Sequence, residues 1–253
     1  MNMTPLSGSN KIVVVGGGAA GMMAAGMAAQ AGAQVTLLEQ NGRLGKKLLI
    51  TGKGRCNVTN DCPWQDVLQN VPTNPRFLYS AFAAFDNRDM MALLEGLGVP
   101  LKVERGGRVF PASDKSSDVL RAVERYVRES GAEVRLHTRV TGIAVSGGAV
   151  RAVRTEAGEL PCEAVVLATG GCSYPQTGST GDGYRIASKL GHTIVPTRAS
   201  LVPLEAETDC ARMQGLSLRN VSLTLFCGDK VLYREQGEML FTHFGVSGPL
   251  VLS

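Results

Sequence analysis

Two short apolar runs near the start of the chain flank a segment of small residues. The runs cover 12–15 and 35–38, and the segment 22–31 between them is rich in Ala, Met and Gly and ends at Gly32. Continuous β-branched and aliphatic runs of this length are typical of buried parallel strands. A helix between two such strands returns the chain to the same edge of a sheet. The pattern therefore predicts a strand–helix–strand unit and the α/β fold class.

Further along, helical and β periodicities follow one another. Apolar positions at helical spacing predict helices over 74–97, interrupted near Asp86-Asn87, and over about 116–129. Alternation over 134–153, with a hairpin turn at Gly147-Gly148, predicts strands, and the run 164–167 predicts another buried strand. Beyond Pro196 the pattern is β-like. We therefore predict a first domain over 1–193, with a helical excursion at about 61–100, and a β-rich domain over 194–253.

Three glycines mark the point where the first predicted strand turns into the helix. Gly16, Gly18 and Gly21 form G-x-G-x-x-G. The first permits a tight turn, the second leaves room for a pyrophosphate against bare backbone, and the third lets the helix pack closely on the strand. Glu39 directly follows the second strand, where an acid that binds ribose is expected. The unit predicts a Rossmann-like fold that binds a dinucleotide, with the pyrophosphate at the helix amino end.

Three other interpretations of this segment are less consistent with it. A chance glycine-rich turn is conceivable because the chain has 31 glycines in 253 residues, but strand, glycines, helix, strand and acid occur in the required order. Lys11 followed by an apolar stretch mimics a signal peptide, yet the glycine triplet and the second strand argue against export. The glycine break and Gln30 also leave no uninterrupted apolar stretch of the ~20 residues that a membrane span needs.

Composition and charge add little that is specific. The formal net charge of +4 and pI of about 8.8 permit anionic ligands without demanding nucleic acid. The six cysteines form no C-x-x-C pair, and the three histidines lie far apart in the sequence. We therefore expect no metal site, and we interpret the cysteines as reduced thiols of a cytoplasmic protein.

A basic, glycine-rich stretch follows Glu39. Within 41–60, five cations alternate with four glycines: Arg43, Lys46, Lys47, Lys53, Arg55 and Gly42, Gly45, Gly52, Gly54. A P-loop does not fit, because neither Gly-Lys pair is followed by Ser or Thr. Such charge runs are often solvated loops. Directly after a nucleotide fingerprint, however, interleaved glycines and cations favour a loop that wraps a phosphate-bearing cofactor.

Two later segments are also candidates for the same site. The strand 164–167 runs into Thr169 and two glycines, and the end of such a strand lies beside the cofactor in a sheet of this kind. Asp182 precedes a helical pattern that ends at Gly191. As a helix N-cap, Asp182 would have a purely structural role. The sequence supports this structural interpretation and a functional one about equally.

Taken together, these motifs resemble the BaiN-like (YhiN-like) flavoproteins, some of which are named aminoacetone oxidase family proteins or bile-acid dehydro-intermediate reductases. The resemblance covers nearly the whole chain and is most specific over Thr51–Asn60. It also rests on Gly16–Gly21 with Glu39, on Gly107–Pro111, Ala168–Pro175 and Gly181–Gly183, and on Phe241–Gly245. It implies a two-dinucleotide-fold flavoprotein with an inserted β-rich domain and FAD as cofactor. The implied activity is that of an oxidoreductase that reduces a conjugated C=C bond or oxidises a small amine or carbonyl, with NAD(P)H or oxygen as redox partner.

The resemblance also implies roles for individual residues. Gly16, Gly18, Ala20 and Gly21 hold the pyrophosphate, and Glu39, with Gln40 adjacent, holds the adenosine ribose. Arg43, Lys47, Gly52 and Asn57 follow the cofactor toward its flavin end, and Val140 offers backbone groups to the adenine. Arg55 and Cys56 are the catalytic candidates, because their loop approaches the isoalloxazine, where a cation stabilises negative charge on the reduced flavin. No residue is assigned as general acid or base.

The family pattern continues past position 253, so we interpret the chain as truncated, with weaker FAD binding and an unpaired strand edge as expected consequences. One alternative is an NAD(P)-binding oxidoreductase, since Glu39 suits either adenosine ribose. A second is an RNA-associated flavoprotein of the tRNA-modifying kind, suggested by the cations; the basic loop lacks interleaved stacking aromatics, so nucleic acid is disfavoured against a small-molecule substrate. A third is a degenerate fold that serves only as an interaction module, which the intact glycines and Glu39 argue against.

Overall fold

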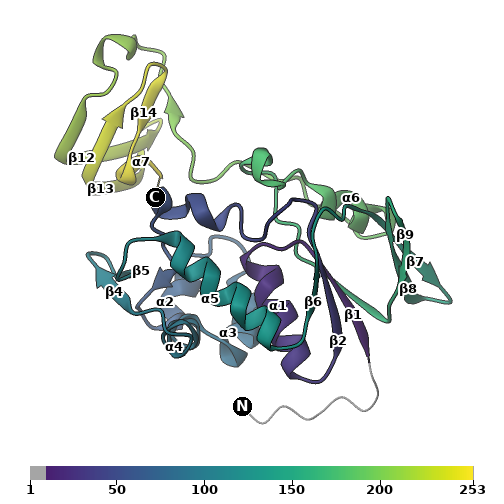
Figure 1. Cartoon of the computed structure of the whole chain (residues 1–253). Helices are drawn as coiled ribbons and strands as arrows, with labels where there is room; N and C mark the ends of the chain where they lie inside the picture. Colours follow the sequence, from purple (N-terminus) through teal and green to yellow (C-terminus); the bar gives the residue numbers. More distant parts are fainter. Residues whose placement is uncertain (1–9, 253) are drawn as a thin grey trace. The chain divides into compact units, whose positions relative to one another are not determined.

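A computed structural model of the chain describes residues 10–252 (Figure 1). The chain divides into two compact units, the first ending at Ile194 and the second beginning at Val195. Residues 1–9 of the predicted first domain and Ser253 of the predicted second lie outside the described residues. Each unit is described by itself below.

A four-stranded parallel sheet organises the first unit. Its strands are β1 (Lys11–Val15), β2 (Gln34–Leu38), β6 (Glu133–Arg135) and β10 (Ala164–Leu167), in the order β10-β1-β2-β6. Helix α1 (Ala19–Gln30) connects β1 to β2, as the apolar pattern predicts. The predicted α/β class and the Rossmann-like strand–helix–strand unit are confirmed.

Helices α1 and α5 (Ser116–Glu129) cover one face of this sheet (Figure 1). Val14 and Leu37 point from the sheet into a core that also contains Met22 of α1 and Val127 of α5, all four with no exposed surface. Removing this apolar area from water is the main force that attaches the helices to the sheet. The helix predicted over 116–129 is therefore confirmed, and its apolar side faces this core.

A second sheet, which is antiparallel, and helix α6 (Asp182–Lys189) cover the opposite face of the parallel sheet. The sheet consists of β7 (Val140–Ser146), β8 (Ala149–Thr155) and β9 (Gly158–Pro161), and the predicted turn at Gly147-Gly148 joins its first two strands. Because successive strand residues alternate between faces, Val13 and Val15 join a core with Val153 and Ile186, away from Val14. Strand β1 is thus buried on both faces.

The segment between β2 and α5 forms the helical excursion and a small sheet. It contains η1 (Leu48–Gly54), α2 (Trp64–Gln69), η2 (Pro75–Leu78), α3 (Tyr79–Ala84) and α4 (Asn87–Gly96). The strands β3 (Thr59–Asn60), β4 (Leu101–Glu104) and β5 (Arg108–Pro111) pair in the order β3-β5-β4. Asp86 caps α4 through the backbone N–H groups of Arg88 and Asp89, which explains the predicted interruption at Asp86-Asn87.

Two expectations about local structure are wrong. Strand β10 is not buried, because it pairs with β1 on one side only, and Val166 and Leu167 are 37% and 36% exposed. Asp182 is not the N-cap of α6. Gly181, whose φ of 78° lies in the left-handed region, takes that position, and Asp182 is the first residue of the helix.

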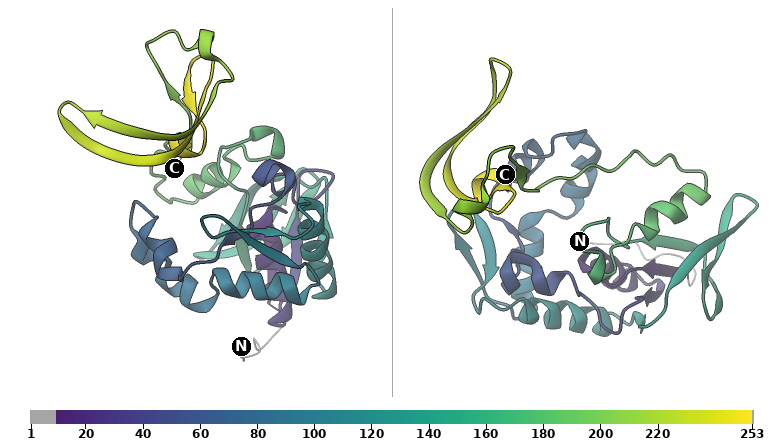
Figure 2. Two further views of the ribbon diagram at one scale, coloured as in Figure 1. Left: turned by 90° about the vertical axis from the view of Figure 1, so that its left-hand side faces the viewer. Right: turned by 90° about the horizontal axis from the view of Figure 1, so that it is seen from above.

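The second unit is an antiparallel sheet. Strands β11 (Leu204–Glu205), β12 (Ser217–Cys227), β13 (Lys230–Phe241) and β14 (Gly245–Ser247) pair in the order β11-β14-β13-β12, and the helical turns η4 (Ala211–Met213) and α7 (Pro249–Leu252) complete it. The β12–β13 hairpin is a long curved ribbon (Figure 2). The β character expected beyond Pro196 is present. None of the helices within residues 10–252 combines the length and hydrophobicity needed to cross a membrane.

Two helical glycines provide a test of the α1–α5 packing. A Cβ atom on Gly26 would lie 2.1 Å from Cε1 of Tyr126, whereas one on Gly96 would meet no atom within 4 Å. We expect Gly26→Ala to lower the free energy of unfolding by roughly 1–3 kcal/mol, because the Tyr126 ring must shift. Gly96→Ala should leave it unchanged or raise it by up to about 1 kcal/mol through helix propensity. Urea unfolding of both variants measures the difference, and equal values would contradict the packing described.

Candidate functional site

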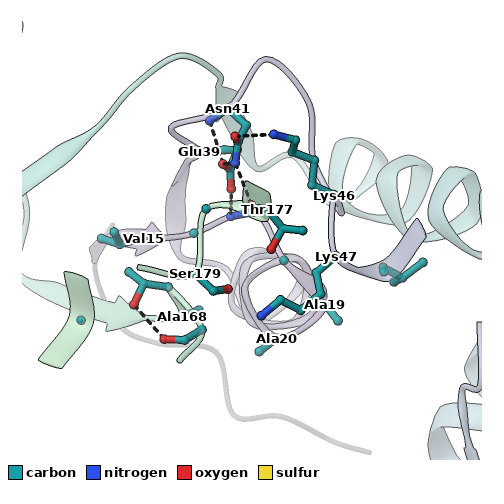
Figure 3. Close-up of a pocket in the computed structure, with 18 of the residues that line it drawn as sticks. Val15, Ala19, Ala20, Glu39, Asn41, Lys46, Lys47, Ala168, Thr177 and Ser179 are labelled. Carbon is teal, nitrogen blue, oxygen red and sulfur yellow. Dashed lines mark hydrogen bonds between the residues drawn. The ribbon is translucent and has the colours of Figure 1, made fainter. Parts of the chain in front are cut away.

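A cavity of about 720 Å³ lies at the carboxyl ends of the parallel strands. Its wall includes residues from the loops that follow β1, β2, β6 and β10, among them Gly16, Glu39, Arg139 and Thr169. Figure 3 shows the start of α1, with Ala19 and Ala20, at the same place. The carboxyl edge of a parallel sheet is where open α/β folds bind ligands. The volume is in the range of cavities that bind cofactors.

The three glycines of the fingerprint differ in what surrounds them. A Cβ on Gly16, whose φ is 106°, would lie 2.5 Å from the carbonyl oxygen of Ala168, and one on Gly21 would lie 1.8 Å from the carbonyl oxygen of Gly16. A Cβ on Gly18 would meet nothing within 4 Å, and Gly18 lies on the cavity wall as the N-cap of α1. Gly16 and Gly21 are therefore required by the protein's own packing. Gly18 leaves space for a ligand.

Glu39 is buried at the edge of this cavity. Its Oε2 accepts a hydrogen bond of 2.7 Å from the backbone N–H of Gly17, and its Oε1 accepts bonds of 2.8 and 2.6 Å from the backbone and side-chain nitrogens of Asn41 (Figure 3). Only 7% of the residue is exposed. A buried carboxylate needs such donors, and they hold its two oxygens in one orientation beside the start of α1.

The loop after Glu39 is connected to a distant segment, 173–178. Gln40 Nε2 donates to the carbonyl of Gly178 at 2.9 Å, and Lys47 Nζ donates to that of Ser173 at 2.7 Å. Asn41 and Lys46 donate to the neighbouring carbonyls of Thr177 and Gln176. The two lysines therefore bind backbone oxygens beside the cavity. The sequence contained no signal for this connection, because side chains from one loop meet carbonyls over a hundred residues away.

The backbone of 51–57 is unusual. Gly52, Lys53, Gly54 and Cys56 have φ of 56°, 58°, 85° and 63°, all in the left-handed region. A non-glycine residue held there costs on the order of 1–3 kcal/mol, so the surrounding structure must stabilise the conformation of Lys53 and Cys56. Thr51, Cys56 and Asn57 line the cavity. Burial raises the pKa of the Cys56 thiol, although a hydrogen bond with Thr51 opposes the change.

Most of the predicted site residues meet at this cavity. Those on its wall are Gly16, Gly18, Ala20, Glu39, Gln40, Lys47, Cys56, Asn57, Val140 and Thr169. Four others do not line it: Gly21, Arg43, Gly52 and Arg55. Gly21 packs beneath the glycine turn, Arg43 is exposed, and Gly52 backs onto Phe110 and the backbone nitrogen of Asn57. Arg55, expected near the isoalloxazine, instead pairs with Glu104 and Asp114.

Other lining residues were not expected from the sequence. One part of the wall is apolar, with Met23, Leu48, Met90, Val119 and Val123. These side chains follow ordinary core periodicity, so nothing in the sequence distinguishes them from the rest of the core. Another part is polar and includes Ser179 and Arg139, together with Asp182, for which the sequence left a functional role open. Arg139 and Asp182 approach to 3.7 Å. Asp182 thus contributes to the site rather than capping α6.

Comparison with known proteins agrees with the resemblance found in the sequence. The pattern of the HI0933-like protein Rossmann domain family matches residues 10–248. The chain is 34% identical to the 3-dehydro-bile acid delta(4,6)-reductase of Clostridium scindens over 94% of this chain and 58% of that protein. It is 33% identical to the ribosomal RNA dihydrouridine synthase of Haemophilus influenzae over 95% of this chain and 59% of that protein. The chain therefore spans less than two thirds of the length of these relatives.

Among solved structures, the Mycobacterium smegmatis Sdh1 complex in its apo form has a similar fold. The TM-score is 0.52 with 21% sequence identity, covering 71% of this chain and 39% of that one. This likeness concerns the fold alone and adds to the confirmation of the Rossmann-like architecture. The resemblance to the BaiN-like flavoproteins is confirmed by the family match and the bile acid reductase.

The accessibility of two thiols tests the geometry of the cavity wall. Cys56 is 4% exposed and its pKa is raised, whereas Cys172 is exposed. The raised pKa keeps Cys56 protonated at neutral pH, and the thiolate is the reactive form. We therefore expect iodoacetamide at neutral pH to alkylate Cys172 well before Cys56, as measured by mass spectrometry. Urea should remove the difference, and equal rates in the native chain would contradict the position of Cys56.

Proposed function

Because the chain belongs to the HI0933-like Rossmann-domain family, we propose that it binds FAD in the cavity at the start of α1 and acts as an oxidoreductase. The observation that carries the proposal is the open backbone at Gly18, beside the buried carboxylate of Glu39. The open backbone at Gly18 fits a pyrophosphate, and the Glu39 carboxylate fits the hydroxyl donors of a ribose.

The residues of the cavity suit the different parts of FAD. The backbone N–H groups at the start of α1, at Ala19 and Ala20, face the space left by Gly18 and are suited to phosphate oxygens, with the positive end of the helix dipole behind them. Glu39 would accept hydrogen bonds from the adenosine ribose, and Val140 lies on the same wall for the adenine. Lys47 is near enough to exchange its backbone oxygen partner for a phosphate.

Residues in another part of the cavity would contact the flavin end of FAD. Thr51, Cys56 and Asn57 line the cavity beside the apolar residues Leu48 and Val58. Bound there, FAD supplies a reversible two-electron, hydride-transferring group. The protein's contribution is to orient it and to exclude water, which the apolar wall favours.

We further propose that the substrate is a compound whose C=C bond is conjugated with a carbonyl group. The names of two relatives describe such reductions: a 3-dehydro-bile acid delta(4,6)-reductase and a ribosomal RNA dihydrouridine synthase. In a conjugate reduction of this kind, a hydride adds to the end of the C=C bond remote from the carbonyl and a proton adds to the other carbon, so that the bond gains two hydrogen atoms. NAD(P)H is the proposed source of the reducing equivalents. Oxygen, an electron acceptor, would serve only the alternative activity, oxidation of a small amine or carbonyl compound.

RNA is a second candidate substrate. Two relatives, at 33% and 32% identity, are named ribosomal RNA dihydrouridine synthases, and the formal net charge of this chain is +4. A cationic surface favours association with a polyanion. We place a small conjugated carbonyl compound first, because the cavity wall contains a large apolar part and no aromatic residue other than Tyr184 for base stacking.

FAD binding can be tested with two glycine variants of this chain. We expect Gly18→Ala to fold normally, since the added Cβ meets no protein atom, but to bind FAD at least about tenfold more weakly because the methyl group occupies the pyrophosphate's space. Gly142→Ala in β7 lies off the cavity and serves as the control. Binding is measured from flavin fluorescence, and the released cofactor is identified by chromatography. NAD(P) instead of FAD, or no effect at Gly18, would refute the proposed cofactor or its position.

The substrate class has its own test. The FAD-loaded chain is incubated anaerobically with NADPH or NADH and either a 3-oxo-4,6-diene steroid or a uridine-containing RNA. We expect the steroid to gain two hydrogen atoms by mass spectrometry, with the Gly18→Ala variant as the control. Reduction of uridine alone would select the RNA candidate. Reduction of neither compound by a chain with bound FAD would refute the proposed reductase activity.

A further inference from the structure

The loop 51–57, which contains four left-handed residues, leads directly into the small β3-β5-β4 sheet. The backbone N–H of Val58 donates to the carbonyl of Val109 at 2.8 Å, and Thr59 pairs with Val109 in the sheet. Strand β5 therefore lies directly behind the residues that form the cavity wall. Its next residue, Phe110, is 2% exposed.

Phe110 contacts the loop at two places. A Cβ on Gly52 would lie 3.1 Å from Cε1 of the ring, and the Arg55 guanidinium carbon lies 4.0 Å from the ring centroid. The loop thus contacts one edge of the Phe110 ring through the backbone at Gly52 and one face of the ring through the guanidinium of Arg55. A guanidinium over an aromatic face is an attractive arrangement. The contact fixes Gly52 and Arg55, which lie on either side of the left-handed Lys53.

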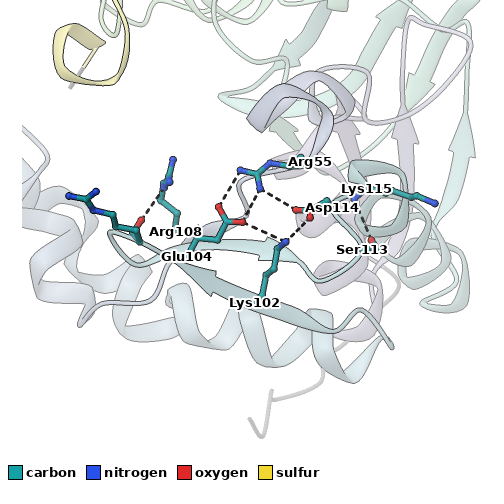
Figure 4. Close-up of polar contacts among 8 residues, drawn as sticks. Arg55, Lys102, Glu104, Arg108, Ser113, Asp114 and Lys115 are labelled. Atoms are coloured by element: carbon teal, nitrogen blue, oxygen red, sulfur yellow. Dashed lines mark hydrogen bonds and ion pairs between the residues drawn. The ribbon is translucent and has the colours of Figure 1, made fainter. Parts of the chain in front are cut away.

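The charge of Arg55 is compensated away from the cavity (Figure 4). Its two terminal nitrogens donate to the two carboxylate oxygens of Glu104 at 2.9 and 3.3 Å, and Nη1 also reaches Asp114 at 3.2 Å. Lys102 donates to Asp114 at 2.6 Å and lies 3.6 Å from Glu104. Two cations and two carboxylates therefore form a closed cluster. A bidentate pair constrains direction as well as distance, so the cluster holds Arg55 in one position.

We infer that Arg55 is a positioning residue for the flavin end of the cavity, acting through Phe110 and the Glu104–Asp114–Lys102 cluster. The inference rests on the proposed binding of FAD. Arg55 does not touch the cavity itself; it holds the loop whose neighbouring residues, Thr51, Cys56 and Asn57, do. The positive charge of Arg55 therefore stabilises the conformation of the loop. The loop residues that a ligand in the cavity would contact are its neighbours Thr51, Cys56 and Asn57.

The test compares Arg55→Ala with a control that removes an equally cationic side chain. Arg88→Ala is suitable, because Arg88 does not line the cavity and, within residues 10–252, its side chain forms a single exposed ion pair, with Asp61 at 3.5 Å. The backbone N–H that Arg88 donates to Asp86 is kept in the variant. We expect Arg55→Ala to increase the hydrogen exchange rate of the amides in 51–57 and to weaken FAD binding about tenfold, since the wall is no longer held in one conformation. The fluorescence of bound flavin should also change. Arg88→Ala should change none of these.

Glu104→Gln tests the ion pair specifically, because it removes the carboxylate charge while Arg55 keeps its contact with the Phe110 ring. We expect it to raise amide exchange in 51–57 and to weaken FAD binding in the same direction as Arg55→Ala, by a smaller factor because Asp114 still pairs with Arg55. Unchanged exchange and unchanged binding in Arg55→Ala would overturn the inference. A lower flavin reduction potential with unaltered exchange would also overturn it, because it would indicate that the guanidinium acts directly on the flavin.

The two proposals can fail separately. If the unaltered chain binds no FAD, the proposed function is refuted, and amide exchange in 51–57 of the FAD-free chain still tests whether Arg55 holds the loop. If the unaltered chain binds FAD and Arg55→Ala changes neither exchange nor affinity, only the positioning role is refuted.

Discussion

The close approach of α1 to β1, made at Gly21 and the carbonyl of Gly16, is the constraint from which the rest of the first unit follows. No side chain fits between the helix and the turn, since a Cβ on Gly21 would come within 1.8 Å of the carbonyl oxygen. The contact places the amino end of α1 at the carboxyl edge of the sheet, where its unpaired N–H groups face the cavity. It also fixes where the chain returns as β2, and hence where Glu39 emerges beside Gly17. The proposed phosphate site at the start of α1 and the position of Glu39 therefore depend on the same helix–turn contact.

Around that unit, the alternation of strand side chains separates two apolar cores. Val14 faces α1 and α5 while Val13 and Val15 face β8 and α6, so strand β1 is covered on both faces, whereas β10 at the end of the sheet is partly exposed. The cavity lies at the carboxyl edge of the sheet. The loops that follow each strand meet there. Their contacts are mostly between side chains and backbone carbonyls, as in the bonds from Gln40 and Lys47 to the segment 173–178. Rigid elements thus set the position of the cavity, and loop contacts set its outline.

This division explains which features could be predicted from the sequence. The strand–helix–strand unit, the close packing at Gly16 and Gly21, the open backbone at Gly18 and the position of Glu39 follow from local periodicity and from the absence of a side chain on glycine. The exposure of β10 could not be predicted, because a strand at the edge of a sheet has the same apolar sequence as a central one. The replacement of Asp182 by Gly181 as N-cap depends on a left-handed turn that the sequence permits without specifying. The contacts of 40–47 with 173–178 join segments whose sequences carry no pattern of their own.

The basic loop shows most clearly why charge in a sequence does not assign a role. Lys47 and Arg55 lie eight positions apart in one glycine-rich stretch, yet their partners differ in kind. Lys47 lines the cavity and donates to the neutral backbone and hydroxyl oxygens of Ser173, so its positive charge is available to an anionic ligand. Arg55 has carboxylate partners, and its hydrogen bonds with Glu104 raise its own pKa and lower that of Glu104. A positive charge neutralised by carboxylates contributes little field at a distance, since the opposite charges cancel. The partner of each cation, rather than the number of cations, therefore decides whether it binds a cofactor or holds the wall that faces it.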